Sequence, residues 1–321
     1  MSRTIAIAGG SSPTLGRSIV TAISQTSNTP IILSRLTNSP PPTTLYDAEV
    51  RPVDYTSHSS LVSALDGVHT VISVLKIPGP EWLTYQINLL QAAKKAGVKR
   101  FAPSEWENGP LADGKVELLA LKPIAWQECM KSGLECTRFG GGMFMNYLGL
   151  GRDFGEDEEL EQEVLQGFVD VPVIWDIAAG VAEVPVKADG STPKITLTDI
   201  RDIGRFVAAA CELPDGEWAG SMEMVGETIS LDEVTELIEE VSGRKLERRP
   251  DDREALQQRV DGIEGIGRTR EEMVTKMISQ INLCTLEEQE GMCILRPVVN
   301  RLCPGVRPSS VRQFLVKCWV V

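Results

Sequence analysis

The first half of the chain alternates short apolar runs with segments of helical spacing, and this alternation is the strongest constraint on its fold. Continuous apolar runs predict strands buried on both faces, and apolar residues recurring every three or four positions predict helices. Strands joined by helices pair in parallel, because the chain must cross back over the sheet between them. We therefore predict an α/β fold built on a doubly wound parallel sheet.

The predicted elements fill most of the first 150 residues and become sparser after Gly151. Predicted strands are Thr4–Ala8, Pro30–Ser34, Glu49–Val53, His69–Leu75, Lys99–Ala102 and Leu134–Arg138. Predicted helices are Leu15–Ser24, Ser59–Leu65, Trp82–Ala96, a segment from Lys122 or Pro123 to Lys131, Asp199–Cys211, Ser230–Ser242 and the polar stretch Asp251–Asn282. Ser230 and Glu233 form the pattern of a capping box. The acidic run Glu156–Glu163 is expected to be a solvated loop or helix face, with a lid or partner contact as the alternative.

The charge balance argues against two classes of partner. The chain has 321 residues, with 32 basic and 45 acidic side chains and a net charge of −13. This balance repels nucleic acid and anionic membranes, so neither is expected as a partner. No apolar run of about 18 residues is present, and the apolar start is too short for a secretory segment. We expect a soluble, cytoplasmic protein.

Metal and triad chemistry are also disfavoured. The two histidines, His58 and His69, are too few for most histidine-based metal clusters and leave few ways to build a Ser-His-Asp triad. The seven cysteines are scattered without a CxxC pair, which indicates free thiols in a reducing compartment rather than a zinc site or a disulfide framework. No metal is expected.

A glycine turn separates the first predicted strand from the first predicted helix. The interval from Gly10 to Gly16 matches the outer glycines of a dinucleotide-binding loop, in which backbone N–H groups at the helix start face a pyrophosphate. Pro13 replaces the middle glycine and removes one donor, so the loop must differ locally. The alternative is a βα turn without a ligand. Candidate cofactor contacts here are Gly10, Ser12, Pro13, Thr14, Leu15 and Gly16.

The second predicted strand ends in Ser34 and Arg35, at the position where NAD-dependent enzymes of this architecture carry an acidic residue. An arginine there neutralises a 2′-phosphate, which favours NADP(H) over NAD(H). We expect at least about a tenfold preference for NADPH, equivalent to roughly 1.4 kcal/mol. A surface arginine without a ligand is the alternative.

Several segments resemble the NmrA-like and isoflavone-reductase-like branch of the atypical short-chain dehydrogenases. They are IAIAGGSSPTLGRSIV from residue 5, LSR ending at Arg35, VKRFAPSEW from Val98, Lys122, GLECTRFGGGMFMNYLG from Gly133, and DIRDIGRFVAAA from Asp199. The segment LCPGVRPSSVRQFLVKCW from Leu302 is similar to the tail of fungal NmrA-like proteins. The resemblance implies an NADP(H)-binding Rossmann domain over residues 1–150 and a smaller α/β substrate-binding region over residues 151–321. Within that region, some segments between about residues 180 and 212 are expected to return to the Rossmann sheet.

The resemblance also implies a catalytic lysine at a helix start near the nicotinamide, and Lys122 matches that position. Pro123 suits the first turn of a helix. The surrounding segment LLALKPIAW is mostly apolar, so partial burial would tune Lys122 for acid–base chemistry. A lysine that reaches solvent is the alternative. The Tyr-x-x-x-Lys pair of other dehydrogenases is absent, since no tyrosine has a lysine four residues later.

Further candidates are residues just beyond predicted strands or within the family segments. Expected cofactor contacts are Lys76, Pro103, Ser104, Lys122, Gly142 and Phe144, and expected substrate contacts are Glu105, Trp106, Met143, Asn146 and Tyr147. Core packing is the alternative for the aromatic members, and a loop lysine is the alternative for Lys76.

Three functions remain open from the sequence. The leading hypothesis is an NADPH-dependent reductase of a medium-sized apolar or aromatic carbonyl or enone in secondary metabolism. The second is an NADP-binding redox sensor that regulates a protein partner without catalysis. The third is a non-redox isomerase, dehydratase or cyclase that reuses the fold. In each case we expect a monomer or homodimer, and for the two enzymes a small-molecule substrate.

Overall fold

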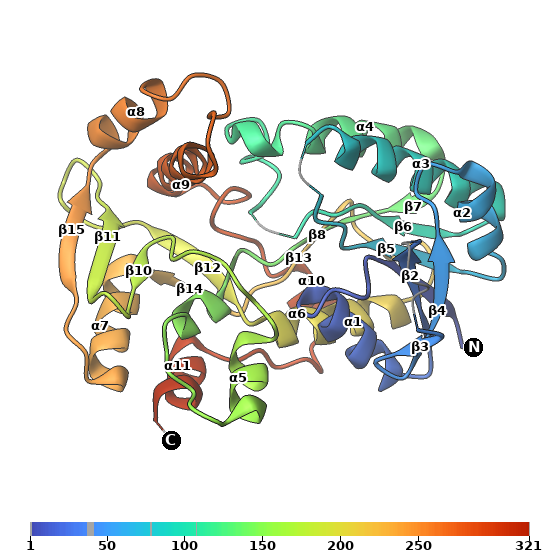
Figure 1. The fold of residues 1–321 in the computed structure, drawn as a ribbon, viewed down its shortest axis with the longest axis horizontal. Helices are drawn as coiled ribbons and strands as arrows, with labels where there is room; N and C mark the ends of the chain where they lie inside the picture. Colours follow the sequence, from blue (N-terminus) through green and yellow to red (C-terminus); the bar gives the residue numbers. More distant parts are fainter. Residues whose placement is uncertain (1, 37–41, 78, 107, 321) are drawn as a thin grey trace.

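The molecule is built around a seven-stranded sheet in the order β3-β4-β2-β1-β5-β6-β7 (Figure 1). This computed structural model describes residues 2–36, 42–77, 79–106 and 108–320. The strands are β1 (Thr4–Ala8), β2 (Thr29–Arg35), β3 (Thr44–Leu45), β4 (Ala48–Val53), β5 (Thr70–Ser73), β6 (Arg100–Ala102) and β7 (Glu135–Cys136). All pairings are parallel except that of the short edge strand β3. The predicted doubly wound α/β fold is confirmed.

Two helices distant in sequence cover one face of this sheet. Helix α1 (Leu15–Ser24) follows β1, and helix α6 (Ile200–Glu212) lies alongside it. Apolar residues of both helices pack on alternate strand residues such as Ile7 and Ile72. At the contact, a Cβ on Gly204 of α6 would lie 2.3 Å from Ser18 Oγ, so the backbones of α1 and α6 approach closely.

Three helices that follow the strands in chain order cover the other face. They are α2 (His58–Ala64), α3 (Glu81–Ala96) and α4 (Lys122–Ser132). Their apolar residues pack on the strand residues that point away from α1, among them Ala6, Leu33 and Phe101. The two faces therefore use alternate residues of the same strands, as the twofold repeat of a strand requires.

The predicted strand Leu134–Arg138 is split in two. After β7 the chain changes sheets at Thr137, whose N–H still donates to Phe101 O (3.2 Å) while its hydroxyl donates to Ala219 O (2.6 Å). Strand β8 (Arg138–Gly140) then pairs with β13 (Ser221–Glu223). The short segment Leu134–Arg138 carries no local signal for this change of partner.

The remaining elements enclose a second apolar core on the left of Figure 1. Its strands are β9 (Met143–Phe144), β10 (Trp175–Asp176), β11 (Val181–Pro185), β12 (Lys194–Thr198), β14 (Glu227–Ser230) and β15 (Glu247–Asp251). Its helices are the 3-10 helices η1 (Glu117–Leu119) and η2 (Met145–Gly149), with α5 (Glu158–Leu165), α7 (Leu231–Ser242), α8 (Arg253–Asp261), α9 (Arg270–Leu286) and α11 (Val311–Trp319). Helix α10 (Val298–Leu302) packs instead in the first core through Val299. The capping box of Ser230 and Glu233 is present at the start of α7.

Two stretches after residue 150 can be compared with the structure here. Of residues 180–212, helix α6 packs on the seven-stranded sheet, whereas strands β11 and β12 pair with β10, β15, β14 and β9. The polar stretch Asp251–Asn282 holds two helices, α8 and the greater part of α9, separated by a segment with left-handed glycines at positions 265 and 267. The boundary near residue 150 stays a prediction.

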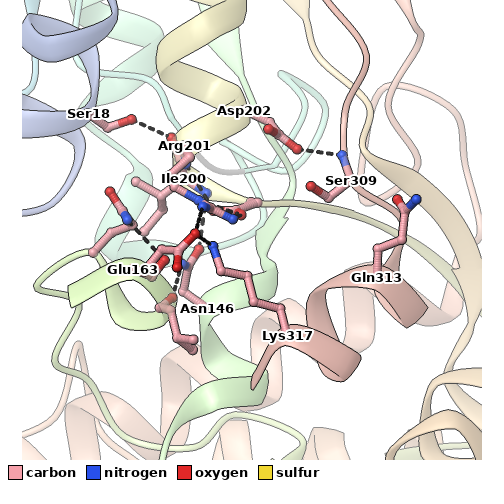
Figure 2. A network of polar contacts seen from close by, with 12 residues as sticks. Ser18, Asn146, Glu163, Ile200, Arg201, Asp202, Ser309, Gln313 and Lys317 are labelled. Carbon is pink, nitrogen blue, oxygen red and sulfur yellow. Dashed lines mark hydrogen bonds and ion pairs between the residues drawn. The ribbon is translucent and has the colours of Figure 1, made fainter. Parts of the chain in front are cut away.

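A polar network ties α5 and α11 to the start of α6 (Figure 2). Glu163 of α5 accepts a hydrogen bond from Arg201 of α6 (2.8 Å) and is also paired with Lys317 of α11. Ser18 of α1 donates to the carbonyl of Ile200 (2.8 Å), so α1 joins the same network. These contacts fix the position of α5 relative to the turn that precedes α1.

Candidate functional site

The glycine turn lies at the carboxyl end of β1, where open α/β sheets bind ligands. The left-handed residue is Gly9 (φ +81°), one position before the glycine that the spacing indicated. Gly10 donates its N–H to Ile7 O (3.1 Å), and Ser12 donates to Gly9 O (3.0 Å). The turn thus carries its own hydrogen bonds before α1 begins at Leu15.

Gly16 allows the helix to start directly on this turn. A Cβ there would lie 2.8 Å from the carbonyl oxygen of Gly10 and 2.9 Å from that of Gly9. Thr14 precedes the helix, but its hydroxyl shares a hydrogen bond with Ser12 Oγ (2.8 Å) and makes no side-chain cap. The helix N-terminus keeps its positive end directed at this edge, which suits an anion.

Arg35 ends β2 beside the same turn. The turn is tied to β2 by the hydrogen bond from Gly9 N–H to Leu33 O (3.2 Å). Arg35 is exposed and Ser34 is half-buried. A second cation, Arg17, stacks over the ring of Tyr46 with 5.5 Å to the centroid. Sequence analysis did not single out Arg17, although a basic residue just after Gly16 was a usable signal.

Lys122 and Glu105 form a buried ion pair. Glu105 follows β6, and Lys122 is the first residue of α4. Lys122 Nζ lies 3.7 Å from Glu105 Oε2, with side chains 11% and 6% exposed. Because its side chain is only 11% exposed, Lys122 does not extend into solvent, which was the alternative for this residue.

Buried polar contacts hold the segment before Glu105 in place. Pro103 and Ser104 are both buried. Ser104 N–H donates to Gln86 Oε1 (3.4 Å), and the Gln86 amide donates to Ser73 Oγ (2.9 Å). This chain of contacts fixes Ser104 between β5 and α3. It sets the direction in which the chain leaves β6 toward Glu105.

An aromatic cluster consists of Phe144, Tyr147 and Phe168. Phe168 meets Phe144 edge to face at 5.9 Å between centroids and meets Tyr147 at 4.7 Å. The Tyr147 hydroxyl donates to Asp170 Oδ2 (3.2 Å), and Lys76 Nζ lies 3.9 Å from the same oxygen. Phe168 and Asp170 were missed by sequence analysis, because the segment after α5 has no periodicity.

The same segment touches the glycine turn. Gly167 has φ +65°, and a Cβ there would lie 2.7 Å from Pro13 Cβ. Residues 166–170 therefore join the aromatic cluster to the turn. A glycine four residues after the acidic run Glu156–Glu163 was the available signal for this contact.

Two expected substrate contacts are not brought to the site. Trp106 is 4% exposed, stacks on Phe139 and donates its indole N–H to Ser73 O (2.9 Å), so it belongs to the core below. Asn146 is fully buried, donates to Val164 O (2.7 Å) and accepts from Ile200 N–H (3.0 Å). Both side chains make their polar contacts inside the protein.

Gly142 and Met143 are also set by packing. Gly142 has φ +69°, and a Cβ there would lie 2.4 Å from Thr196 O. The glycine is therefore required by the pairing of β9 with β12, whether or not a ligand approaches. Met143 is half-buried against the second core.

Comparison with known proteins identifies the family. The model of the NmrA-like family matches residues 1–292. The chain belongs to the NmrA-like family. Oxidoreductase BOA1 of Botryotinia fuckeliana (strain B05.10) is 33% identical to it over 251 residues, which cover 75% of this chain and 76% of BOA1.

Solved structures share the NmrA-like fold of this chain. The structure described as AtPrR2 with NADP+ and (+)pinoresinol has a TM-score of 0.72 at 19% identity, covering 98% of each chain. A structure from work on pinoresinol-lariciresinol and phenylcoumaran benzylic ether reductases also has a TM-score of 0.72, at 21% identity over 100% of each chain. Among the described residues of this NmrA-like protein, no helix is long and apolar enough to span a membrane.

Proposed function

We propose that this chain is an NADPH-dependent reductase of a medium-sized apolar or aromatic carbonyl or enone in secondary metabolism. The observation that carries the proposal is the buried pair of Lys122 and Glu105, at the same sheet edge as the glycine turn. The relative BOA1 is named an oxidoreductase, and AtPrR2 was solved with NADP+.

The residues at the glycine turn fit a phosphorylated dinucleotide. Gly16 leaves no room for a side chain between the turn and α1, and the helix start offers backbone N–H groups to the pyrophosphate. Arg35, exposed beside the turn, supplies the charge that would bind the 2′-phosphate. When bound, NADPH supplies the hydride.

Lys122 is the proposed acid in this reaction. Its ammonium group would donate a hydrogen bond to the substrate carbonyl oxygen and transfer a proton as negative charge develops there. Glu105, whose Oε2 lies 3.7 Å from Lys122 Nζ, holds the ammonium group in place. Because both side chains are largely shielded from water, the attraction between the Lys122 ammonium group and a developing negative charge on the substrate oxygen is less screened than at the surface.

The aromatic cluster is the proposed substrate surface. Phe144, Tyr147 and Phe168 present ring faces and edges near the turn, and rings of this kind bind flat apolar molecules by offset or edge contacts. Asp170 and Lys76 lie at its rim, where a polar group of the substrate would be accommodated. This arrangement supports an aromatic or apolar substrate.

The test is NADPH consumption, followed by absorbance with a panel of aromatic ketones and enones. Lys122→Ala should lower kcat by about 10²–10⁴-fold, the usual contribution of a general acid. Lys131→Ala is the matched control, because Lys131 lies on the same helix, is 68% exposed and pairs only with Glu128 on the surface. NADPH binding without consumption would replace this proposal with the sensor, and conversion without nicotinamide would replace it with a non-redox enzyme.

Cofactor choice is tested separately by fluorescence titration. Wild type should bind NADPH at least about tenfold more tightly than NADH, and Arg35→Ala should remove that difference, roughly 1.4 kcal/mol. Equal affinities of the wild-type protein for both cofactors would refute the role of Arg35.

A further inference from the structure

A pair of thiols lies away from the site, between α4 and the edge strand β7. Cys129 is on the last turns of α4, and Cys136 ends β7. Cys136 Sγ lies 3.5 Å from the carbonyl oxygen of Cys129, so the Cys136 thiol packs directly against the Cys129 residue. The proposed reductase chemistry uses neither.

Ser132 organises the pair. Its hydroxyl donates to Cys129 O (2.6 Å) and lies 3.6 Å from Cys136 Sγ. The hydroxyl of Ser132 also accepts from Leu134 N–H (3.1 Å), which shapes the turn between α4 and β7. Ser132 therefore fixes the Cys136 sulfur against the Cys129 backbone at the turn between α4 and β7.

The two thiols differ in accessibility. All seven cysteines are among the described residues, and Cys136 is the one that is not buried. Cys129 is 2% exposed. Cys136 is partly exposed and lies on the edge strand β7, so a small reagent has access to it. Cys129 is buried beneath the surface.

Their acidities differ in the same sense. The pKa of Cys136 is lowered, because its interactions with the Cys129 thiol and the nearby Ser132 hydroxyl outweigh its partial burial. The pKa of Cys129 is raised, because the same thiol–thiol contact and burial both disfavour its charged form. Cys136 is thus the better nucleophile and Cys129 the thiol that follows.

We propose that Cys136 and Cys129 form a peroxide-sensitive modification site, in which Cys136 is oxidised first and Cys129 resolves it as a disulfide. The Cys136 thiolate attacks a hydroperoxide oxygen, forming an S–O bond and breaking the O–O bond; hydroxide leaves and takes up a proton as water. Cys129 then attacks the Cys136 sulfur, forming the S–S bond and breaking the S–O bond, and the departing hydroxide takes up the Cys129 thiol proton as a second water. Two thiols and one hydrogen peroxide give one disulfide and two waters. A thiol reductant reverses the step.

The sequence makes this bond easy to detect. Trypsin cleaves after Lys131, between the two cysteines, and cuts poorly at Lys122 because Pro123 follows. The disulfide therefore joins two separate peptides, Val116–Lys131 and Ser132–Arg138. Full-length protein is titrated with hydrogen peroxide from about one to ten equivalents, a range that starts at the one peroxide needed per disulfide. Each sample is then alkylated and digested without reductant.

The expected product is the linked peptide pair, lost after dithiothreitol and absent from Cys129→Ser and Cys136→Ser. Cys303→Ser, which removes a cysteine in another part of the fold, should keep it. In Cys129→Ser, dimedone should trap a sulfenic acid on Cys136. Oxidation of Cys136 to sulfinic acid in wild type without linked peptides would overturn the proposal.

A measurement on unmodified wild type covers the case of a variant that does not fold. Phenylarsine oxide binds two thiols only when they are adjacent, so one equivalent should protect Cys129 and Cys136 together from alkylation. Protection of neither thiol, or of only one, would overturn the pairing. Neither outcome depends on whether the chain reduces a carbonyl.

Discussion

Arg100 is the buried cation whose removal should cost the most stability. Its side chain is 0% exposed. The guanidinium donates to Glu135 Oε2 (2.8 Å), to Leu213 O (2.9 Å) and to Pro214 O, and lies over the Trp218 ring at 4.9 Å from the centroid. Arg100 thereby joins β6 and β7 to the end of α6. Arg100→Met keeps an unbranched, flexible side chain and removes every one of these contacts.

The magnitude follows from what Arg100→Met leaves behind. Breaking a buried ion pair from one side costs about 3–5 kcal/mol, because the remaining charge stays desolvated. Glu135 is 18% exposed and still accepts from Trp218 N–H (2.7 Å), which favours the lower end of that range. We expect about 3 kcal/mol, or roughly a 1 M fall in the urea midpoint if m is near 3 kcal/mol/M.

The assay is urea unfolding at 25 °C, followed by tryptophan fluorescence and by circular dichroism. Arg249→Met is the matched control, because the Arg249–Glu247 pair has side chains 53% and 64% exposed. Exposed pairs contribute about 0–1 kcal/mol, so that midpoint should barely move. Equal shifts for the two variants, or a loss below about 1 kcal/mol for Arg100→Met, would refute the reasoning.

Acid provides a second check on the same pair. Burial alone would raise the pKa of Glu135, but hydrogen bonds from Arg100 and from backbone N–H groups outweigh it and hold the pKa below its ordinary 4.5. A lowered carboxyl pKa adds stability that is complete above 4.5 and is lost as the pH falls through the folded-state value. The difference in the free energy of unfolding between wild type and Arg100→Met should therefore become smaller below pH 4.5.

Three further predictions concern packing and the turn. Gly204→Ala should destabilise by about 1–3 kcal/mol in thermal unfolding, since its Cβ would lie 2.3 Å from Ser18 Oγ, whereas Gly114→Ala, with nothing within 4 Å, should change stability by less than about 0.5 kcal/mol. Asn146→Ala should cost about 2 kcal/mol by urea unfolding, because it leaves one buried N–H and one buried C=O without their partner; a neutral effect would contradict this. Gly16→Ala should raise the Kd for NADPH at least about tenfold by fluorescence titration, and an unchanged Kd would exclude close packing of the turn as a requirement.

The sheet and its helices were predictable because local signals and burial agree there. The run Thr4–Ala8 is apolar since both sheet faces are covered, and the boundaries of α1 coincide with those expected from spacing. Ser230 and Glu233 predict the start of α7, because the capping box joins residues three apart in the sequence. Elements that depend on near neighbours in the sequence can be predicted in this way.

Only part of the aromatic cluster could be predicted from the sequence: Phe144 and Tyr147 were expected, whereas Phe168 is placed by tertiary contacts. Phe168 meets Tyr147 because Glu163 anchors α5 to α6 and α11, and no local pattern encodes that distance. Asn146 shows the opposite error: a polar residue in a family motif suggested a ligand contact, yet its amide serves two backbone groups. Buried polar residues and ligand contacts look alike until burial is known.

The pairing of α1 with α6 has a consequence for how the chain folds during synthesis. One side of α1 carries apolar residues such as Ile19 and Val20, and these share a core with Phe206 and Val207 of α6. A ribosome that has completed the seven strands must still make about 60 residues before α6 exists, which takes roughly 3–12 s at 5–20 residues per second. During that interval the apolar side of α1 faces water or a chaperone. At that point all seven strands of the sheet have been made and can pair with one another, but the apolar contacts between α1 and α6 have not yet formed.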